Sequence, residues 1–144
     1  MAAKSPIDVS YGSDGRPTPR QSEIDVGRDL GADARPQISF KGGEEVNRGA
    51  KDSTRPDYCL DSTCSVIEVK NYNISTNRYG LINDTVNQAI KRQEQLPAGT
   101  TQEVVIDVRG QNLTPGIRAK IIDGITTKSN GIISGDKIKF KVEQ

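Results

Sequence analysis

The amino-acid sequence predicts an α/β (α+β) domain in which helices pack on a mixed β-sheet. Three features support this fold class: residues 55–72 have the pattern of a β-hairpin, residues 104–108 form a continuous apolar run, and helical patterns at 81–95 and after Thr114 lie between strands. Helices that connect strands of one sheet pack against its faces. The order of elements therefore indicates a mixed sheet flanked by helices.

The chain is the size of one domain. Its 144 residues can enclose one hydrophobic core, which must rest on Ile, Val and Leu because there are only four Tyr, two Phe and no Trp. No segment approaches the roughly 18–20 consecutive apolar residues of a membrane span. The N-terminal residues also lack an apolar signal core. We expect either a cytosolic protein or a piece cut from a larger one.

The N-terminal segment predicts a leader followed by a helix. Residues 1–20 are polar and rich in Gly and Pro, which indicates a flexible leader ahead of a domain at 21–144. The first helix is expected to begin at a Ser22 cap and to run to about Leu30, where Gly31 closes it.

Short strands are expected between this helix and the hairpin. The alternation at 37–41 predicts a strand that ends at Gly42-Gly43, and another short strand includes Glu45-Val46. Residues 48–54 read as a polar loop, and residues 73–80 as a polar turn after the hairpin.

The clearest helix covers residues 81–95 and ends at Leu96-Pro97-Ala98-Gly99. Its expected stripe consists of Ile82, Val86, Ile90 and Gln93, and Ala89 joins it.

The C-terminal third predicts strand, helix and strand. The run at 104–108 is apolar apart from Asp107, which is typical of a parallel strand covered on both faces. Thr114-Pro115 has the cap and first-turn residues of a helix. Residues 136–142 alternate strictly and read as a half-exposed strand whose lysines protect an edge. The apolar stripe of the helix consists of Ile117, Ile121, Ile122 and Ile125.

The hairpin at 55–72 carries the most informative polar residues. In a strand, side chains at i and i+2 point to the same face, so Glu68 and Lys70 share one face while Ile67 and Val69 pack on the other. If the two strands pair, Asp57 meets Glu68 and Lys70. Two carboxylates and an ammonium at one place suit a divalent cation and an activated water.

The composition excludes several other chemistries. The chain has no histidine, which rules out Ser-His-Asp and Cys-His catalysis as well as histidine metal centres. The net charge of +1, from 20 basic and 19 acidic residues, does not by itself indicate nucleic-acid binding. Cys59 and Cys64 are too few for a tetrahedral zinc site, and they form either a disulfide across the hairpin or two free thiols.

The order Asp57, Glu68, Lys70 resembles the PD-(D/E)xK nuclease superfamily, since the Asp follows a Pro and the Glu and Lys flank one apolar residue. Further segments extend the resemblance, across roughly residues 21–144, to the C-terminal nuclease domains of bacterial polymorphic toxins, including contact-dependent growth inhibition and Rhs proteins. The segments that carry it are Arg55-Pro56-Asp57, Glu68-Val69-Lys70-Asn71-Tyr72-Asn73, Gln88-Ala89-Ile90, Leu96-Pro97-Ala98-Gly99 and Val105-Ile106-Asp107-Val108-Arg109-Gly110.

The resemblance implies a restriction-endonuclease-like sheet and a catalytic site that holds Mg²⁺ or Mn²⁺. Asp57, Glu68 and the backbone carbonyl of Val69 would bind the ion, and Lys70 would act beside the phosphate. An acidic residue on the first helix, Glu23 or the alternative Asp25, would complete the metal shell.

Helix residues after the hairpin are further candidates. In related nucleases a Gln of this helix points towards the site, and here it is Gln88, which is also an ordinary helix residue. Lys91 and Arg92 either contact phosphate or are solvated charges on a helix face. Tyr72 falls on the face of Glu68 and Lys70, where it lines the cleft or packs beside it.

At the level of the whole protein, the resemblance implies an endonuclease toxin. Such a domain sits on a secreted or cell-surface carrier, is delivered into the cytoplasm of a competing bacterium, and is neutralised at home by a cognate immunity protein. DNA is the favoured substrate and tRNA the alternative. Two other hypotheses stay open: a non-catalytic binding domain with a nuclease-like fold, and an RNase without a metal that relies on Lys, Arg or Tyr.

Overall fold

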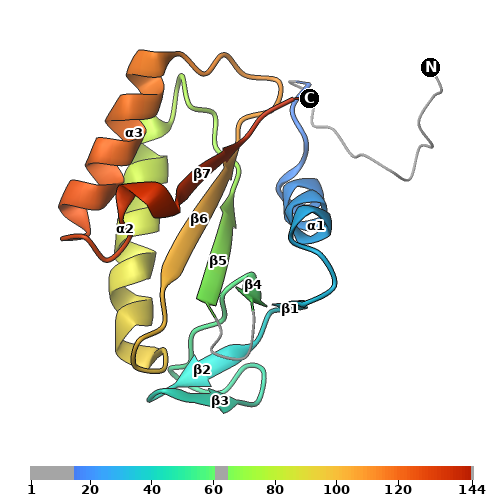
Figure 1. Ribbon diagram of the computed structural model, residues 1–144, viewed down its shortest axis with the longest axis vertical. Helices are drawn as coiled ribbons and strands as arrows, with labels where there is room; N and C mark the ends of the chain where they lie inside the picture. Colours follow the sequence, from blue (N-terminus) through green and yellow to red (C-terminus); the bar gives the residue numbers. More distant parts are fainter. Residues whose placement is uncertain (1–14, 61–64, 144) are drawn as a thin grey trace.

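The computed structural model describes residues 15–60 and 65–143. The strands form a sheet and the helices flank it, as predicted (Figure 1). In chain order the elements are α1 (Pro19–Leu30), β1 (Ala34–Pro36), β2 (Ser39–Lys41), β3 (Glu44–Val46), β4 (Tyr58–Leu60), β5 (Ser65–Lys70), α2 (Arg78–Gln95), β6 (Gln102–Asp107), α3 (Pro115–Lys128), the 3-10 turn η1 (Gly135–Lys137) and β7 (Ile138–Lys141).

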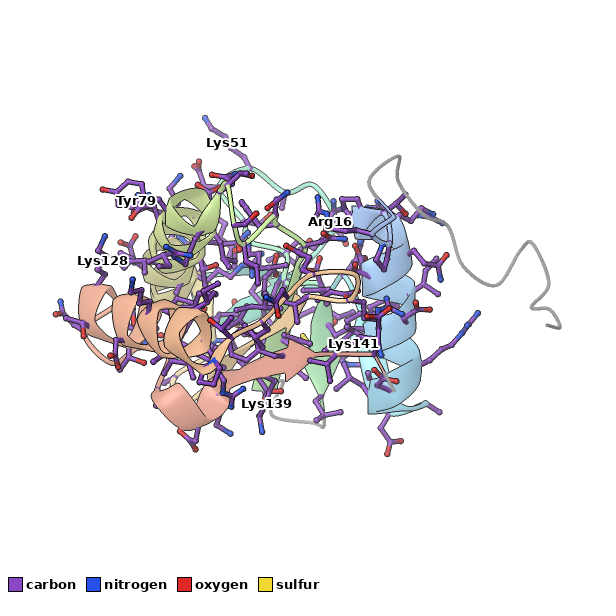
Figure 2. All side chains as sticks on the ribbon, turned by 90° about the horizontal axis from the view of Figure 1, so that it is seen from above. Arg16, Lys51, Tyr79, Lys128, Lys139 and Lys141 are labelled. Carbon is purple, nitrogen blue, oxygen red and sulfur yellow. The ribbon has the colours of Figure 1, made fainter. Side chains whose placement is uncertain are left out.

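The main sheet is mixed and has the strand order β1-β4-β5-β6-β7. β4 runs antiparallel to both of its neighbours, β1 and β5, whereas β5, β6 and β7 are parallel to one another. α2 and α3 cover one face of the sheet and α1 lies on the other face (Figure 1), and Figure 2 shows the same three layers from above. The predicted mixed sheet flanked by helices is confirmed.

The main core lies between the sheet and the pair α2 and α3. Val104 and Ile106 of β6 are completely buried, as are Ile121 and Ile125 of α3. The prediction that the apolar run forms a parallel strand is therefore confirmed, and its second face is partly covered, since Val105 is half-buried and Asp107 is buried. None of the helices that the structure describes combines the length and apolarity needed to cross a membrane.

α2 buries part of its predicted apolar stripe, namely Ile82, Val86 and Ala89, but the buried face is rotated away from the rest of the stripe. The predicted stripe residues Ile90 and Gln93 are exposed, and Ile90 retains 42% of its accessible surface. The helix also begins earlier than predicted, at Arg78. Two polar residues, Thr85 and Arg92, complete the buried face, and a pattern based on apolar residues alone does not include them. The buried residues of the helix are Leu81, Ile82, Thr85, Val86, Ala89 and Arg92.

α1 begins before the predicted Ser22 cap. Thr18 is the actual N-cap, and its hydroxyl accepts a hydrogen bond from Gln21 N at 3.1 Å, while Pro19 occupies the first helical position. Ser22 is buried inside the helix, where its hydroxyl accepts a hydrogen bond from Asn71 Nδ2 at 2.8 Å. The expected leader therefore extends past the start of α1. The predicted end at Gly31, which has a φ of 93°, is confirmed.

The short strands of the N-terminal half differ in detail from the prediction. β2 is shorter than the predicted strand because Gln37 has a φ of 52°, outside the strand region, and it pairs with β3 in a separate two-stranded sheet. β1 was not predicted. Cys59 is buried on β4, but Cys64 lies outside the described residues, so the choice between a disulfide and two free thiols lies outside them too.

Candidate functional site

The candidate site lies where β5 continues past the end of β4. The antiparallel pairing of the two strands runs from Tyr58↔Ile67 to Leu60↔Ser65, so residues 68–70 extend beyond it. The predicted hairpin is confirmed. Asp57, which was placed on the first strand, directly precedes β4 instead.

Asp57 contacts β5 through its side chain. Val69 N donates a hydrogen bond to Asp57 Oδ2 at 2.8 Å, and Asp57 N donates one to Glu68 Oε1 at 3.3 Å. The side chain of Asp57 thereby accepts a bond that a strand carbonyl would accept if the ladder continued. The structure brings Asp57 and Glu68 together, as the sequence predicts.

The electrostatics of Asp57 follow from this arrangement. Burial, the negative charge of Glu68 and, more weakly, that of Glu23 raise the pKa of Asp57 to about 7, although the hydrogen bond from Val69 N opposes the shift. Carboxylates placed this close stabilise each other poorly in the ionised state. A cation bound between them would relieve that repulsion.

Lys70 lies on the same face as Glu68 and points towards α2. Its ammonium donates a hydrogen bond to Gln88 Oε1 at 2.6 Å and lies 3.8 Å from Glu68 Oε2. Burial lowers the pKa of Lys70, Glu68 acts in the opposite direction, and Arg92 adds to the lowering. Gln88 therefore lies at the predicted site, as the acceptor that orients the ammonium.

Of the two acidic candidates on α1, the structure places Glu23 beside the site. Its negative charge acts on Asp57, and Glu23 Oε1 accepts a hydrogen bond from Gln37 Nε2 at 2.9 Å. Asp25 points elsewhere, because its Oδ2 lies 2.9 Å from Arg109 Nη2. The alternative that Asp25 completes the metal shell does not fit this geometry.

Arg92 has a position that the sequence analysis missed. The side chain was interpreted as a phosphate contact or a solvated charge, yet Arg92 is only 5% exposed and its Nη1 contacts Glu68 Oε1 at 2.5 Å. Lys91, in contrast, is exposed. Helical spacing could have indicated the contact, because residue 92 follows Gln88 by one turn on the same side of α2.

Tyr72 packs beside the site. Its hydroxyl donates a hydrogen bond to Asp84 Oδ2 at 2.5 Å, and its ring lies against the main core. Burial and this hydrogen bond to Asp84 raise the pKa of Tyr72 to about 12. Of the two expected positions for Tyr72, the structure shows the packed one, and a phenol with this pKa does not serve as a base near neutral pH.

The donor set suits a hard divalent cation. Within residues 15–60 and 65–143, no group of three or more acidic, His or Cys side chains is arranged to hold a metal ion. Mg²⁺ commonly binds through one or two carboxylates and takes its other ligands from water and substrate phosphate. Asp57 and Glu68 supply such a pair, and Glu23 lies near it. The amide of Val69 donates a hydrogen bond to Asp57 Oδ2, which places Val69 at the same position.

Comparisons of this chain with protein-family models, with curated proteins and with solved structures give no match. The chemistry of the site is therefore what indicates a function. Two close carboxylates and a buried ammonium are suited to binding a cation and an anionic substrate side by side.

Proposed function

We propose that this protein is a Mg²⁺- or Mn²⁺-dependent nuclease that hydrolyses phosphodiester bonds. The observation that carries the proposal is the contact between Asp57 and Glu68 with Lys70 on the same strand face. Acidic oxygens select a hard cation, and the ammonium provides a partner for a phosphate oxygen. Ser-His-Asp chemistry is excluded because the sequence has no histidine.

Each side chain has a defined role in this proposal. Asp57 and Glu68 would bind the ion, with Glu23 and the carbonyl of Val69 as further ligands, and Gln88 holds Lys70 in place through the 2.6 Å hydrogen bond. When bound, the ion supplies positive charge to the scissile phosphate and lowers the pKa of the attacking water. Lys70 orients that water and offsets charge that develops on the phosphate.

The biological setting is proposed from the family resemblance. DNA is the favoured substrate and tRNA the alternative on the same fold. In this setting the domain is a toxin of bacterial competition that is carried by a secreted or cell-surface protein into the cytoplasm of another cell. A cognate immunity protein would block it in the cell that makes it.

The proposal is tested by incubating the purified protein with plasmid DNA and with total tRNA, with Mg²⁺ or with EDTA. We expect Mg²⁺-dependent cleavage, and Glu68→Gln or Lys70→Ala should lower the rate at least about 100-fold. Glu44→Gln, an exposed carboxylate on β3, is the matched control and should keep full activity.

The outcomes separate the hypotheses. Intact plasmid with cleaved tRNA would reassign the substrate to tRNA. Cleavage that resists EDTA would replace the metal mechanism with one that uses Lys, Arg or Tyr. If neither nucleic acid is cut by a folded protein, the catalytic proposal is wrong and a binding domain takes its place.

A further inference from the structure

Arg92 connects the two segments that carry the carboxylates of the site. Its Nη1 contacts Glu68 Oε1 on β5, its Nε donates to Thr54 Oγ1 at 3.1 Å, and its Nη2 donates to the carbonyl of Arg55 at 3.3 Å. Arg55 precedes Asp57 by two residues. One guanidinium therefore spans from β5 to the segment that leads into Asp57.

The contacts of Arg92 oppose the electrostatic repulsion between the carboxylates of Asp57 and Glu68. Asp57 and Glu68 carry like charges when both are ionised. The guanidinium acts there together with the hydrogen bond from Gln37 N to the Asp57 carbonyl at 3.0 Å and the bridge between Phe40 and Thr54. A planar guanidinium makes several hydrogen bonds in fixed directions, which a flexible ammonium cannot reproduce. The side chain of Arg92 is 6% exposed and that of Glu68 is 15% exposed, so solvent weakens the contact little.

The same contact orients the carboxylate of Glu68. Glu68 Oε1 accepts hydrogen bonds from both Arg92 Nη1 and Asp57 N, while Glu68 Oε2 faces the ammonium of Lys70 at 3.8 Å. With Oε1 already bonded to two donors, Oε2 is the oxygen of Glu68 that would be free to bind a cation beside Lys70.

We infer that Arg92 is the positioning residue of this site: its guanidinium fixes the separation of Asp57 and Glu68 and leaves Glu68 Oε2 as the oxygen that would be available to a metal ion. The inference rests on the proposed nuclease function for its catalytic consequence. Its structural consequence, the placement of Asp57, is independent of that function.

Amide hydrogen exchange at Val69 measures the structural consequence directly. The Val69 amide is bonded to Asp57 Oδ2, so it exchanges faster if Asp57 moves away. In Arg92→Met and in Arg92→Lys we expect exchange at Val69 to become at least about fivefold faster, the effect of losing one hydrogen bond. Exchange at Ile106, in the central strand β6, measures any loss of global stability, and the acceleration at Val69 should exceed the acceleration at Ile106 by this factor.

Kinetics measure the catalytic consequence. Both variants should lower kcat at least about tenfold with KM changed less than about threefold, since misplaced ligands act on the chemical step rather than on substrate binding. Lys120→Met, which removes an exposed positive charge on α3, is the control and should change neither kcat nor the exchange at Val69.

The comparison of the two variants decides between position and charge. If Arg92→Lys behaves like the unmodified protein, positive charge alone is sufficient and the inference is wrong. If exchange at Val69 accelerates no more than exchange at Ile106 in both variants, the inference is overturned as well. Should Arg92→Met fail to fold, Arg92→Lys provides both measurements. If the unmodified protein cuts no nucleic acid, the proposed function fails, while the exchange at Val69 still decides the role of Arg92.

Discussion

At the scale of single residues, the carboxyl group of Asp57 has a pKa far from the value it would have in water. Its pKa is raised from 3.8 to about 7 by burial and by the charges of Glu68 and Glu23. Between these two values the folded protein holds a proton that the unfolded chain has released. Stability is therefore greatest at low pH with respect to this group, and it is lost as the pH rises through about 7.

Asp57→Asn should remove this pH dependence. We compare the unfolding free energy of the variant with that of the unmodified protein. This difference should rise in favour of the variant by roughly 1–2 kcal/mol as the pH is raised from about 4.5 to about 7.5, allowing for solvent screening. Urea unfolding of both proteins without metal measures the difference. A difference that does not change with pH would contradict the expected ionisation of Asp57.

The sequence predicts part of this residue-level geometry. Glu68 and Lys70 share a face because strand geometry requires it, and the direction of Gln88 followed from the family resemblance. The burial of Arg92 could not be predicted in the same way. An arginine on a helix usually lies in solvent, and its place depends on how α2 is rotated about its own axis, which local pattern leaves open.

At the scale of elements, that rotation of α2 can be tested with two isoleucines. Ile82 is 8% exposed and packs towards α3, whereas Ile90 is 42% exposed. Ile82→Ala should cost about 2–4 kcal/mol of unfolding free energy, because it removes buried methyl groups and leaves a cavity. Ile90→Ala should change it by less than about 0.7 kcal/mol. Equal losses in urea unfolding would favour the stripe predicted from the sequence.

The contact of α1 with β4 gives a second test. A Cβ added at Gly27 would lie within van der Waals overlap of the Tyr58 hydroxyl, which itself donates to the carbonyl of Glu23 at 2.8 Å. Gly27→Ala should therefore destabilise the protein by about 1–3 kcal/mol despite the better helix propensity of alanine.

The matched control for this change is Gly116→Ala in α3. The nearest atom to a Cβ at Gly116 is Thr114 Oγ1 at 4.0 Å, so the added methyl group fits. We expect this variant to be unchanged or up to about 1 kcal/mol more stable by thermal unfolding. If both glycine variants behave alike, close packing of α1 on Tyr58 is not the cause.

Element boundaries show where local signals succeed. Thr114-Pro115 correctly predicts the start of α3, and Thr18-Pro19 is the same signal at the start of α1. The second was missed because the Gly- and Pro-rich residues before it read as one continuous leader. Strands of three residues such as β1 depend on a partner more than on their own sequence, so their pairing could not be predicted.

At the scale of the whole molecule, Arg109 joins the layer of α1 to the sheet. Its Nη2 lies 2.9 Å from Asp25 on α1 and 2.6 Å from Asp107 at the end of β6. Burial by itself would raise the pKa of Asp107, but hydrogen bonds from Arg109 and Ser22 outweigh it and keep the pKa below its ordinary value. The layers are thus held together by a buried ion cluster as well as by apolar packing.

Arg109→Met should destabilise the protein by about 3–5 kcal/mol, because it leaves buried carboxylates without a counter-ion. Arg28→Met is the control: the Arg28 side chain is 63% exposed and lies 3.7 Å from Asp25, so its loss should cost less than about 1 kcal/mol. Denaturant unfolding compares the two. A small effect at Arg109 would mean that apolar contacts alone fix α1 on the sheet.

The arrangement of the whole sheet was predictable where helices connect strands. The run at 104–108 and the helices around it lead to the parallel order of β5, β6 and β7. The place of β2 and β3 in a separate sheet was not predictable, since it depends on contacts such as the isolated bridge between Phe40 and Thr54.

The hydrogen bond from Val69 N to Asp57 Oδ2 also bears on how an inactive form of the protein should be made. An unsatisfied amide on an exposed strand invites a strand of another molecule to add to the sheet, and this is a common start of aggregation. Asp57→Ala would remove the acceptor that satisfies this amide, whereas Asp57→Asn keeps a side-chain oxygen there. For crystallisation or partner screening, Glu68→Gln or Asp57→Asn is therefore the better choice.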